Sequence, residues 1–450
     1  MSYIRHESLF SLQDLFAMEQ KYRFESIFTA IDIGPILRLV CKKSRLGAPI
    51  EVHYSAMIYS LVARMIERIP TIKDLIRRLR EDLLFRLDCG FMLSDSIPSE
   101  ASYSRLIQKI SQSNALEQIH QQLVAQALQE GFISDDTIAI DATHIEARDQ
   151  APQKRMKDKP EPKKRGRKSK EEHASWLEQK QVEEANKPIY QREIAAQLHE
   201  PYPVLSEHMP LDPQWGIKKN SESNNVFWYG YKAHLAVSTS SQYILGAMLS
   251  SGNLNDGKAA IPLLKGLEWQ HPNFQYCYAT MDAGYDHEPI YQQVRQVGAH
   301  AIIAYNRRRE PEYIGFDEHF APTCVREYAY RYDSYDANYE TLKYVRPKAC
   351  ENCPLQNDSL CQKVYKIKIT SDLRKYTAPA RGSVSWSNIA KRRSAVERVN
   401  AYLKGYFQLN QIRHRSGQKA KAHLNLVSLV YNATKLAVDR MNRQLQQRAA

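Results

Sequence analysis

Apolar residues recur at the spacing of a helix through much of the first 133 residues of the chain. Four candidate helices cover residues 56–69, 72–87, 99–110 and 115–128. Pro70 ends the first of them and Gly131 follows the last, as expected at helix termini. Because these segments carry no strand signal, the sequence predicts an all-α N-terminal domain over residues 1–133. Such a domain either packs against the rest of the protein or binds DNA ends.

At Asp136 the pattern changes to short apolar runs of strand length. The elements follow in the order strand, hairpin, helix, strand, helix and strand, over residues 137–140, 226–250, 259–267, 276–281, 291–297 and 300–304. This order predicts an α/β domain with a mixed central sheet over residues 134–305. Residues 306–385 interrupt it with an insertion rich in Tyr, Arg and Cys, and residues 386–450 are helical and basic.

A polar stretch over about residues 149–215 forms another insertion. Residues 151–170 hold ten Lys or Arg against two acids, which is too polar a composition to be buried. Arg165 and Arg167 flank Gly166, and this pattern fits an extended chain in an A·T-rich minor groove. A solvated basic linker would have the same composition, so DNA contact by the two arginines is a hypothesis.

The overall composition is that of a globular protein, with 43% hydrophobic and 25% charged residues. It excludes collagen-like, disordered and coiled-coil classes. No apolar run approaches the roughly 20 residues that a membrane helix needs, and residues 1–20 lack the apolar centre of a signal peptide. We therefore expect a cytoplasmic protein without a membrane partner. The net charge of +13 favours a polyanionic partner.

Two predicted strands lead directly into an aspartate, Asp141 and Asp282. Carboxylates at strand ends can meet at one edge of a mixed sheet, where they repel each other and require a cation to stay ionised together. Mg²⁺ suits such a site because it prefers oxygen ligands and is bound together with water and phosphate. Two such ions would support an in-line phosphoryl displacement. The alternative is that each aspartate only forms a turn after its strand.

A third acid lies in the basic helical segment of residues 391–404. Arg393 and Glu397 are one helical turn apart, and Lys404 lies within about 20° of the same line. One helix face therefore presents a cation, an acid and a second cation, so that Glu397 can bind metal while its neighbours contact phosphates. Without the two upstream aspartates, a solvated ion pair would be the better explanation.

Four of the seven cysteines fall between Cys324 and Cys361. Cys350 and Cys353 form a CxxC pair that precedes Cys361, and Cys324 lies 26 positions upstream of Cys350. Four thiolates can hold Zn²⁺ in a closed tetrahedral site, which is typically structural. Four reduced thiols in a small subdomain are the alternative.

Taken together, these features resemble the DDE transposases of bacterial insertion sequences, in the group with a Tyr-x2-Arg-x3-Glu-x6-Lys signature. Arg393, Glu397 and Lys404 have the required spacing, and Ala390 stands at the position of the tyrosine. Further segments resemble family motifs in the expected order: residues 79–82, 98–104, 140–144, 229–234 and 282–286. The resemblance extends from about residue 45 to residue 435.

The resemblance implies a ribonuclease H-like catalytic core in which Asp141, Asp282 and Glu397 bind Mg²⁺ or Mn²⁺. It implies cleavage of double-stranded DNA at terminal inverted repeats and strand transfer of the freed 3′-hydroxyl into target DNA. Arg393 and Lys404 would contact phosphates near the scissile bond. A homodimer in a synaptic complex, associated with the nucleoid, is implied as well.

Three further residues lie near these motifs. Lys232 and His234 lie on the hairpin beside the first strand, where they either line the DNA channel or have a structural or solvent-facing role. Asp286 follows Gly284 and is expected to cap the next helix.

Two other functions remain open from the sequence. One is a catalytically inactive or domesticated DNA-binding derivative. The missing signature tyrosine favours this alternative, whereas the intact Asp141, Asp282 and Glu397 argue against it. The other is a ribonuclease H-like DNA nuclease that cuts strands without joining them.

Overall fold

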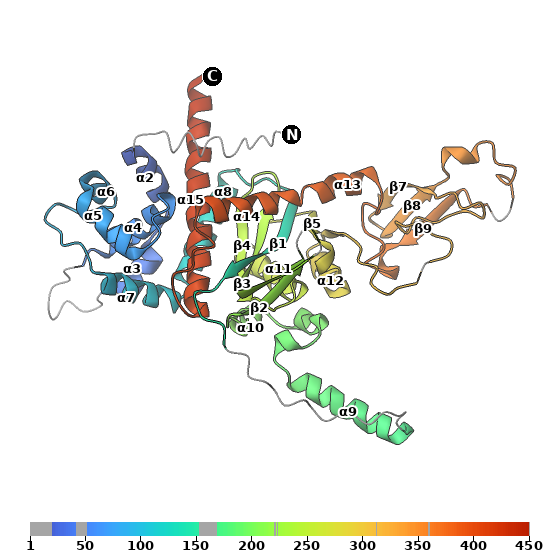
Figure 1. Ribbon diagram of the computed structural model, residues 1–450. Helices are drawn as coiled ribbons and strands as arrows, with labels where there is room; N and C mark the ends of the chain where they lie inside the picture. Colours follow the sequence, from blue (N-terminus) through green and yellow to red (C-terminus); the bar gives the residue numbers. More distant parts are fainter. Residues whose placement is uncertain are drawn as a thin grey trace.

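The computed structural model describes residues 20–41, 52–152, 169–219, 222, 224–311, 313–358 and 361–449. Residues 20–41 and 52–133 contain helices and no strand (Figure 1). These helices are α2 (Gln20–Phe28), α3 (Gly34–Val40), α4 (Tyr54–Ile66), α5 (Ile72–Glu81), α6 (Leu83–Asp88), α7 (Glu100–Ser111) and α8 (Ala115–Gln129). Their apolar faces form part of the main hydrophobic core, as the helical spacing predicts.

The single helix predicted over residues 72–87 is wrong, because Asp82 divides it into α5 and α6. Asp82 has an extended backbone (φ −109°, ψ 101°), and its carboxylate accepts a hydrogen bond of 3.0 Å from the N–H of Phe85. A side chain that caps a helix in this way starts a new helix where the old one ends.

A six-stranded mixed sheet forms the centre of the molecule. Its strands are β1 (Thr137–Glu146), β2 (Gln214–Lys219), β3 (Asn225–Ser238), β4 (Ile244–Ser251), β5 (Tyr278–Met281) and β6 (His300–Ile303). The order is β2-β3-β1-β5-β6, and β4 also pairs with β3. The pairs among β1 to β4 are antiparallel, whereas β1 with β5 and β5 with β6 are parallel. The predicted α/β class with a mixed sheet is confirmed.

Strand β1 is longer than predicted, because its partner β3 is long. The prediction ended the strand at Asp141, but antiparallel pairing continues to Glu146, opposite Gly230. A Cβ atom on Gly230 would lie 2.2 Å from the carbonyl oxygen of Ile145, so only glycine permits this close approach. Asp141 therefore lies within a strand and not at its end.

Helices pack on the sheet and leave nearly every residue of its strand β4 buried. They are α11 (Gly257–Gln270), α12 (Glu288–Gln296), α13 (Val384–Lys391), α14 (Ser394–Tyr406) and α15 (Gly417–Ala449). α14 packs on β1 and β3, and α15 packs on β4 as well as on α2, α4, α7 and α8. The long α15 thus joins the N-terminal helices to the sheet (Figure 1). None of the described helices combines the length and apolar character needed to cross a membrane.

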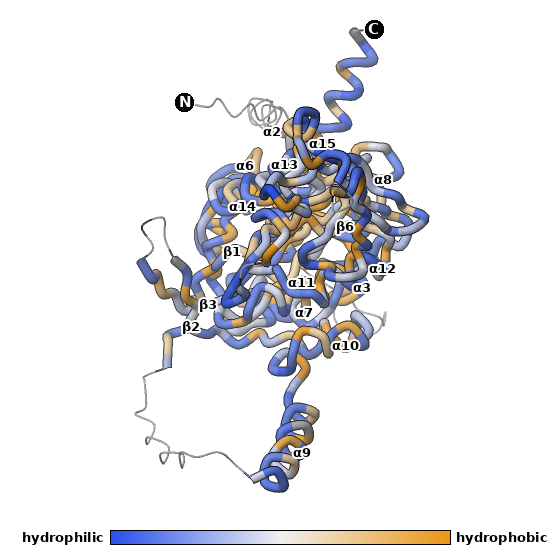
Figure 2. Tube along the Cα trace, turned by 90° about the vertical axis from the view of Figure 1, so that its right-hand side faces the viewer, coloured by the Kyte–Doolittle hydropathy of each residue, from blue (hydrophilic) through white to orange (hydrophobic). Residues whose placement is uncertain are grey.

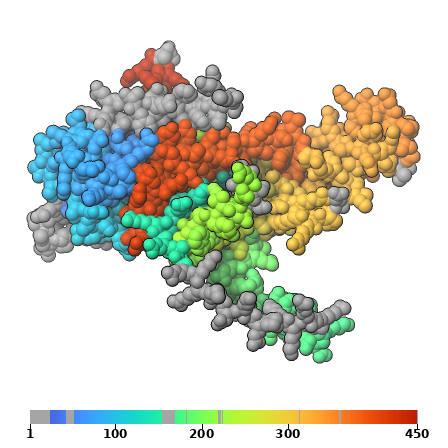
Figure 3. Space-filling model, in the orientation of Figure 1, coloured from blue at the N-terminus to red at the C-terminus, as the bar shows by residue number. Residues whose placement is uncertain are grey.

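Two parts of the chain extend away from this body. The insertion of residues 306–385 holds an antiparallel sheet of β7 (Arg331–Asp336), β8 (Thr341–Val345) and β9 (Val364–Lys368), and it projects to one side (Figure 3). Helix α9 (Lys170–Asn186) projects separately, with nearly all its described side chains exposed (Figure 2). The short helix α10 (Tyr202–Glu207) follows and packs against α11. Arg165 and Arg167 lie outside the described residues.

Candidate active site

The pairing of β1 with β5 places two of the predicted acids side by side. Ala139 of β1 is in register with Thr280 of β5, and the strands are parallel. Two residues further on come Asp141, still within β1, and Asp282, the first residue after β5, and neighbouring strands are about 4.8 Å apart. The two aspartates therefore lie on neighbouring segments, at the point where β5 ends beside the middle of β1.

The third acid, Glu397, lies on α14, which packs across β1 and β3. Burial is the main cause that raises the pKa of Asp141 to about 6, and the negative charges of Asp282 and Glu397 raise it further. Asp141 is therefore within electrostatic range of both Asp282 and Glu397.

The Asp282 side chain is held by its own loop. Its Oδ1 accepts a hydrogen bond of 2.9 Å from the N–H of Gly284. Burial raises the pKa of Asp282, and the charge of Asp256 adds to the effect. Asp256 is a fourth acid that the sequence analysis missed. Its Oδ1 forms an ion pair with Lys232, whose Nζ lies 2.8 Å away.

The two predicted cations of α14 lie around these acids. The Arg393 guanidinium is 2.6 Å from Oε1 of Glu397, and its charge lowers the pKa of both Asp141 and Asp282. Burial lowers the pKa of Lys404, and the charge of Asp141 counteracts this effect. Both cations are therefore within electrostatic range of Asp141.

Strand β2 adds a further cation that the sequence analysis missed, because this strand was not predicted. The exposed Lys218 has its Nζ 3.2 Å from Nδ1 of His144. Burial lowers the pKa of His144 to about 4, and Lys404 and Lys218 contribute to the effect. His144 is therefore neutral at pH 7 and accepts a hydrogen bond from Lys218.

The two candidates on the hairpin have different surroundings. Lys232 donates to the Leu254 carbonyl oxygen (2.9 Å) and to Asp256. His234 is 1% exposed, and its Nε2 lies 2.7 Å from Oγ of Ser250 on the paired strand β4. This burial leaves His234 no surface for DNA contact, so its observed role is structural.

The acids fit a hard divalent cation by their chemistry, since three oxygen donors gather where burial and mutual repulsion disfavour their charged forms. Within the residues that the structure describes, no three Asp, Glu, His or Cys side chains are close enough to hold a metal. One carboxylate oxygen of Glu397, Oε1, pairs with the Arg393 guanidinium at 2.6 Å.

The four clustered cysteines all belong to the insertion, and none of these four forms a disulfide. Cys350 is buried, and burial together with the charges of Cys324, Cys353 and Cys361 raises its pKa. The structure thus brings the four thiols into one neighbourhood. The described cysteines are nevertheless too far apart for three of them to hold a metal ion.

Asp286 does not cap the helix that follows it, and this prediction is wrong. Helix α12 starts after His287, which makes no side-chain capping bond. Asp286 is fully buried and forms an ion pair with Arg374, whose Nη2 lies 2.8 Å from the carboxylate. No local signal in the sequence could have found this pair, because its members are 88 positions apart.

Comparison with protein families gives two matches. The model described as Transposase DDE domain matches residues 133–433, which is more than half of the chain and contains all three predicted acids. The model described as Transposase domain (DUF772) matches residues 10–109. A comparison with curated proteins gives no match. The two family matches confirm the resemblance that the sequence motifs indicate.

Proposed function

The chain belongs to the family of DDE transposases, and from this premise we propose that it cuts double-stranded DNA at terminal inverted repeats and transfers the cut strand into target DNA. Membership itself indicates a DNA-processing enzyme of transposition. One observation carries the finer proposal. The register of β1 with β5 sets Asp141 beside Asp282, beneath the helix that bears Glu397.

In this proposal Asp141 and Asp282 share the divalent cation, Mg²⁺ or Mn²⁺, and Glu397 completes the ligand set. The bound ion would activate the attacking water or 3′-hydroxyl and neutralise charge on the leaving oxygen. Because the pKa of Asp141 is about 6, its carboxylate is ionised at pH 7 to 8 and ready to act as a ligand.

Arg393 and Lys404 would hold DNA phosphates beside the acids, and the exposed Lys218 would extend this cationic surface. Arg393 is half-buried, and its guanidinium forms an ion pair with Glu397. A phosphate that binds Arg393 would therefore release Glu397 toward the metal, so substrate binding and completion of the ligand set would be linked.

The finer architecture belongs to the proposal as well. An antiparallel β4-β3-β1 unit followed by parallel β5 and β6 supports a ribonuclease H-like core. We also propose that the protein acts as a homodimer in a synaptic complex, since two transposon ends have to be processed together. In that complex Arg165 and Arg167 would contact DNA through the basic segment that contains them.

We further propose a structural Zn²⁺ in the insertion, supported by the electrostatic effect of the other three thiols on Cys350. Binding would require these side chains to close around the ion. Metal analysis of the purified chain tests this proposal. Wild type should hold about one zinc per chain, Cys353→Ser should lose it, and Cys277→Ser, at an exposed cysteine outside the cluster, should keep it. Absence of zinc from wild type would leave four reduced thiols.

A strand-transfer assay with pre-cut end DNA, taken from the borders of this gene in its source, tests the main proposal. Wild type should join the end to target DNA in Mg²⁺, whereas Asp282→Asn should bind the end without joining it. Cleavage of intact ends without any joined product would identify a nuclease instead. Binding without either reaction would identify an inactive derivative.

A further inference from the structure

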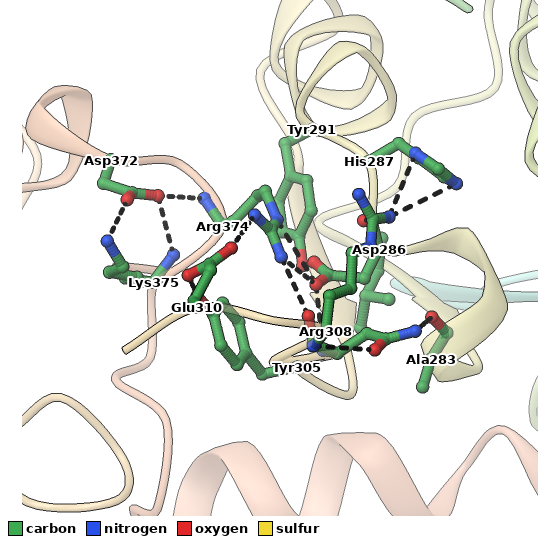
Figure 4. A network of polar contacts seen from close by, with 12 residues as sticks. Ala283, Asp286, His287, Tyr291, Tyr305, Arg308, Glu310, Asp372, Arg374 and Lys375 are labelled. Atoms are coloured by element: carbon green, nitrogen blue, oxygen red, sulfur yellow. Dashed lines mark hydrogen bonds and ion pairs between the residues drawn. The ribbon is translucent and has the colours of Figure 1, made fainter. Parts of the chain in front are cut away.

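A buried ion pair connects the loop of the second aspartate with the end of the insertion. Asp286 has no exposed side-chain surface, and Nη2 and Nε of Arg374 lie 2.8 Å and 3.3 Å from its Oδ2. The Tyr291 hydroxyl (2.8 Å) and the N–H of Asn306 (2.9 Å) donate to the same carboxylate. Figure 4 shows Arg374 and Tyr291 directed at Asp286 from different elements. Four donor groups thus fix one buried charge in place.

The same arginine also binds the segment through which the chain enters the insertion. Nη1 of Arg374 donates to Oε1 of Glu310 at 2.7 Å, and Nη2 donates to the carbonyl oxygen of Asn306 at 3.0 Å. Its guanidinium lies 4.9 Å from the ring centroid of Tyr305, which in turn hydrogen-bonds to Glu310. One guanidinium therefore clamps both the entry and the return of the insertion onto Asp286.

Only one turn of 3₁₀-helix, Ala283–Tyr285, separates Asp286 from Asp282. Within it the N–H of Gly284 donates to Oδ1 of Asp282 at 2.9 Å. The side-chain amide of Asn306 approaches the Ala283 carbonyl oxygen at 3.4 Å. A displacement of Asp286 would therefore be transmitted through a rigid turn to the Asp282 carboxylate.

We infer that Arg374 is a positioning residue. Through Asp286 it sets the orientation of the Asp282 carboxylate. Because Arg374 also contacts both ends of the insertion, this orientation depends on the position of the insertion. This inference rests on the proposed function, because it gives Asp282 the role of a metal ligand. Arginine suits the position because its planar group donates in several fixed directions at once, which a lysine ammonium at the end of a flexible stem does not reproduce.

The test compares Arg374→Lys with a matched control in the full chain. Arg295 of α12 forms another arginine–carboxylate bridge to the insertion, 2.6 Å from Glu340, and this bridge does not touch the Asp282 loop. Arg295→Lys therefore weakens an attachment of the insertion without disturbing Asp286. Four quantities are measured for each protein: Mn²⁺ affinity by calorimetric titration, end-DNA affinity, the cleavage rate and the thermal unfolding midpoint.

Arg374→Lys should weaken Mn²⁺ binding by roughly 10–100-fold, as typical for groups that orient metal ligands, while end-DNA affinity stays within about twofold of wild type. Arg295→Lys should retain the Mn²⁺ affinity of wild type. Unchanged Mn²⁺ affinity in Arg374→Lys, or an equal loss in both variants, would overturn the inference. If Arg374→Lys does not fold, Glu310→Gln removes one anchor of Arg374 and leaves the buried pair. It should weaken Mn²⁺ binding several-fold, and unchanged affinity would again overturn the inference.

Wild type serves to separate this inference from the proposed function. A wild-type chain that neither binds Mn²⁺ nor cleaves end DNA would contradict both. A wild-type chain that does both, beside an Arg374→Lys variant with the same Mn²⁺ affinity, would contradict the positioning role alone.

Discussion

Substitution of Asp141 by asparagine should stabilise the metal-free protein while abolishing its activity. The pKa of Asp141 is about 6 in the folded protein, against an ordinary value of 3.8, chiefly because of burial. At about 1.4 kcal/mol for each pKa unit, the ionised carboxylate costs the folded state at most about 3 kcal/mol at pH 8. Asparagine removes this charge with little change of shape.

The sign of the effect sets the pH at which it appears. Folding raises the pKa of Asp141, so the folded protein is most stable with respect to this group below pH 3.8, where the side chain is protonated in both the folded and the unfolded chain. This stability is lost as the pH rises through about 6. The gain from Asp141→Asn should therefore be largest at pH 8 and fall below about 1 kcal/mol at pH 4. At about 2–4 °C per kcal/mol, the unfolding midpoint should rise by several degrees at pH 8.

Thermal unfolding in EDTA at pH 8 and pH 4 measures this difference directly. The matched control is Asp333→Asn, because the hydrogen bond from Lys343 lowers the pKa of Asp333 and its loss should not raise the midpoint. Added Mn²⁺ should raise the midpoint of wild type and leave that of Asp141→Asn unchanged. Failure of Asp141→Asn to stabilise the protein at pH 8, or equal stabilisation at both pH values, would refute the electrostatic account of the site.

Three further predictions follow from the same geometry. Arg393→Ala should shift the acid limb of the cleavage pH profile to higher pH, because Arg393 lowers the pKa of Asp141, and a pH–rate profile measures the shift. Glu310→Gln should destabilise the protein above pH 4.5 but not near pH 2. The reason is that hydrogen bonds, of which the one from Tyr305 has the largest effect, lower the pKa of Glu310 to about 2. Urea unfolding across this range tests it. Lys404→Ala should reduce the slope of log K against log salt by about 0.9 in end-DNA binding, as for one lost phosphate contact.

Each of these predictions has an outcome that contradicts it. Arg392 pairs with Asp136 at 2.8 Å, so Arg392→Ala is the matched control for its neighbour Arg393. An equal shift of the acid limb in both variants would point to a general effect of charge. A stability difference for Glu310→Gln that persists at pH 2 would exclude its carboxylate as the cause. An unchanged salt slope in Lys404→Ala would remove Lys404 from the phosphate contacts.

The parts of the site that the sequence predicted are those with short-range signals. Asp282 follows a short apolar run, and Arg393, Glu397 and Lys404 are spaced along one helix face. The mixed sheet could be predicted for the same reason, because its central strands are apolar and bounded by turn residues.

The parts that were missed depend on contacts between distant segments. The second half of β1 is polar and becomes a strand only because β3 pairs with it as far as Gly230. Strand β2 is short and largely exposed, so its sequence shows no buried pattern, and Lys218 was missed with it. The partner of Asp286 is Arg374, on the far side of the insertion, and nothing near either residue indicates the pair.

The most direct test of the central claim is an excision assay in Mg²⁺ with a reporter flanked by the DNA that borders this gene in its source. Wild type and Glu397→Gln are compared at equal end-DNA occupancy. Excision by wild type alone is the result that the assignment of Asp141, Asp282 and Glu397 predicts. Excision by both proteins would show that Glu397 is not the third acid. Excision by neither protein, with the ends bound, would contradict the claim that this chain is an active transposase.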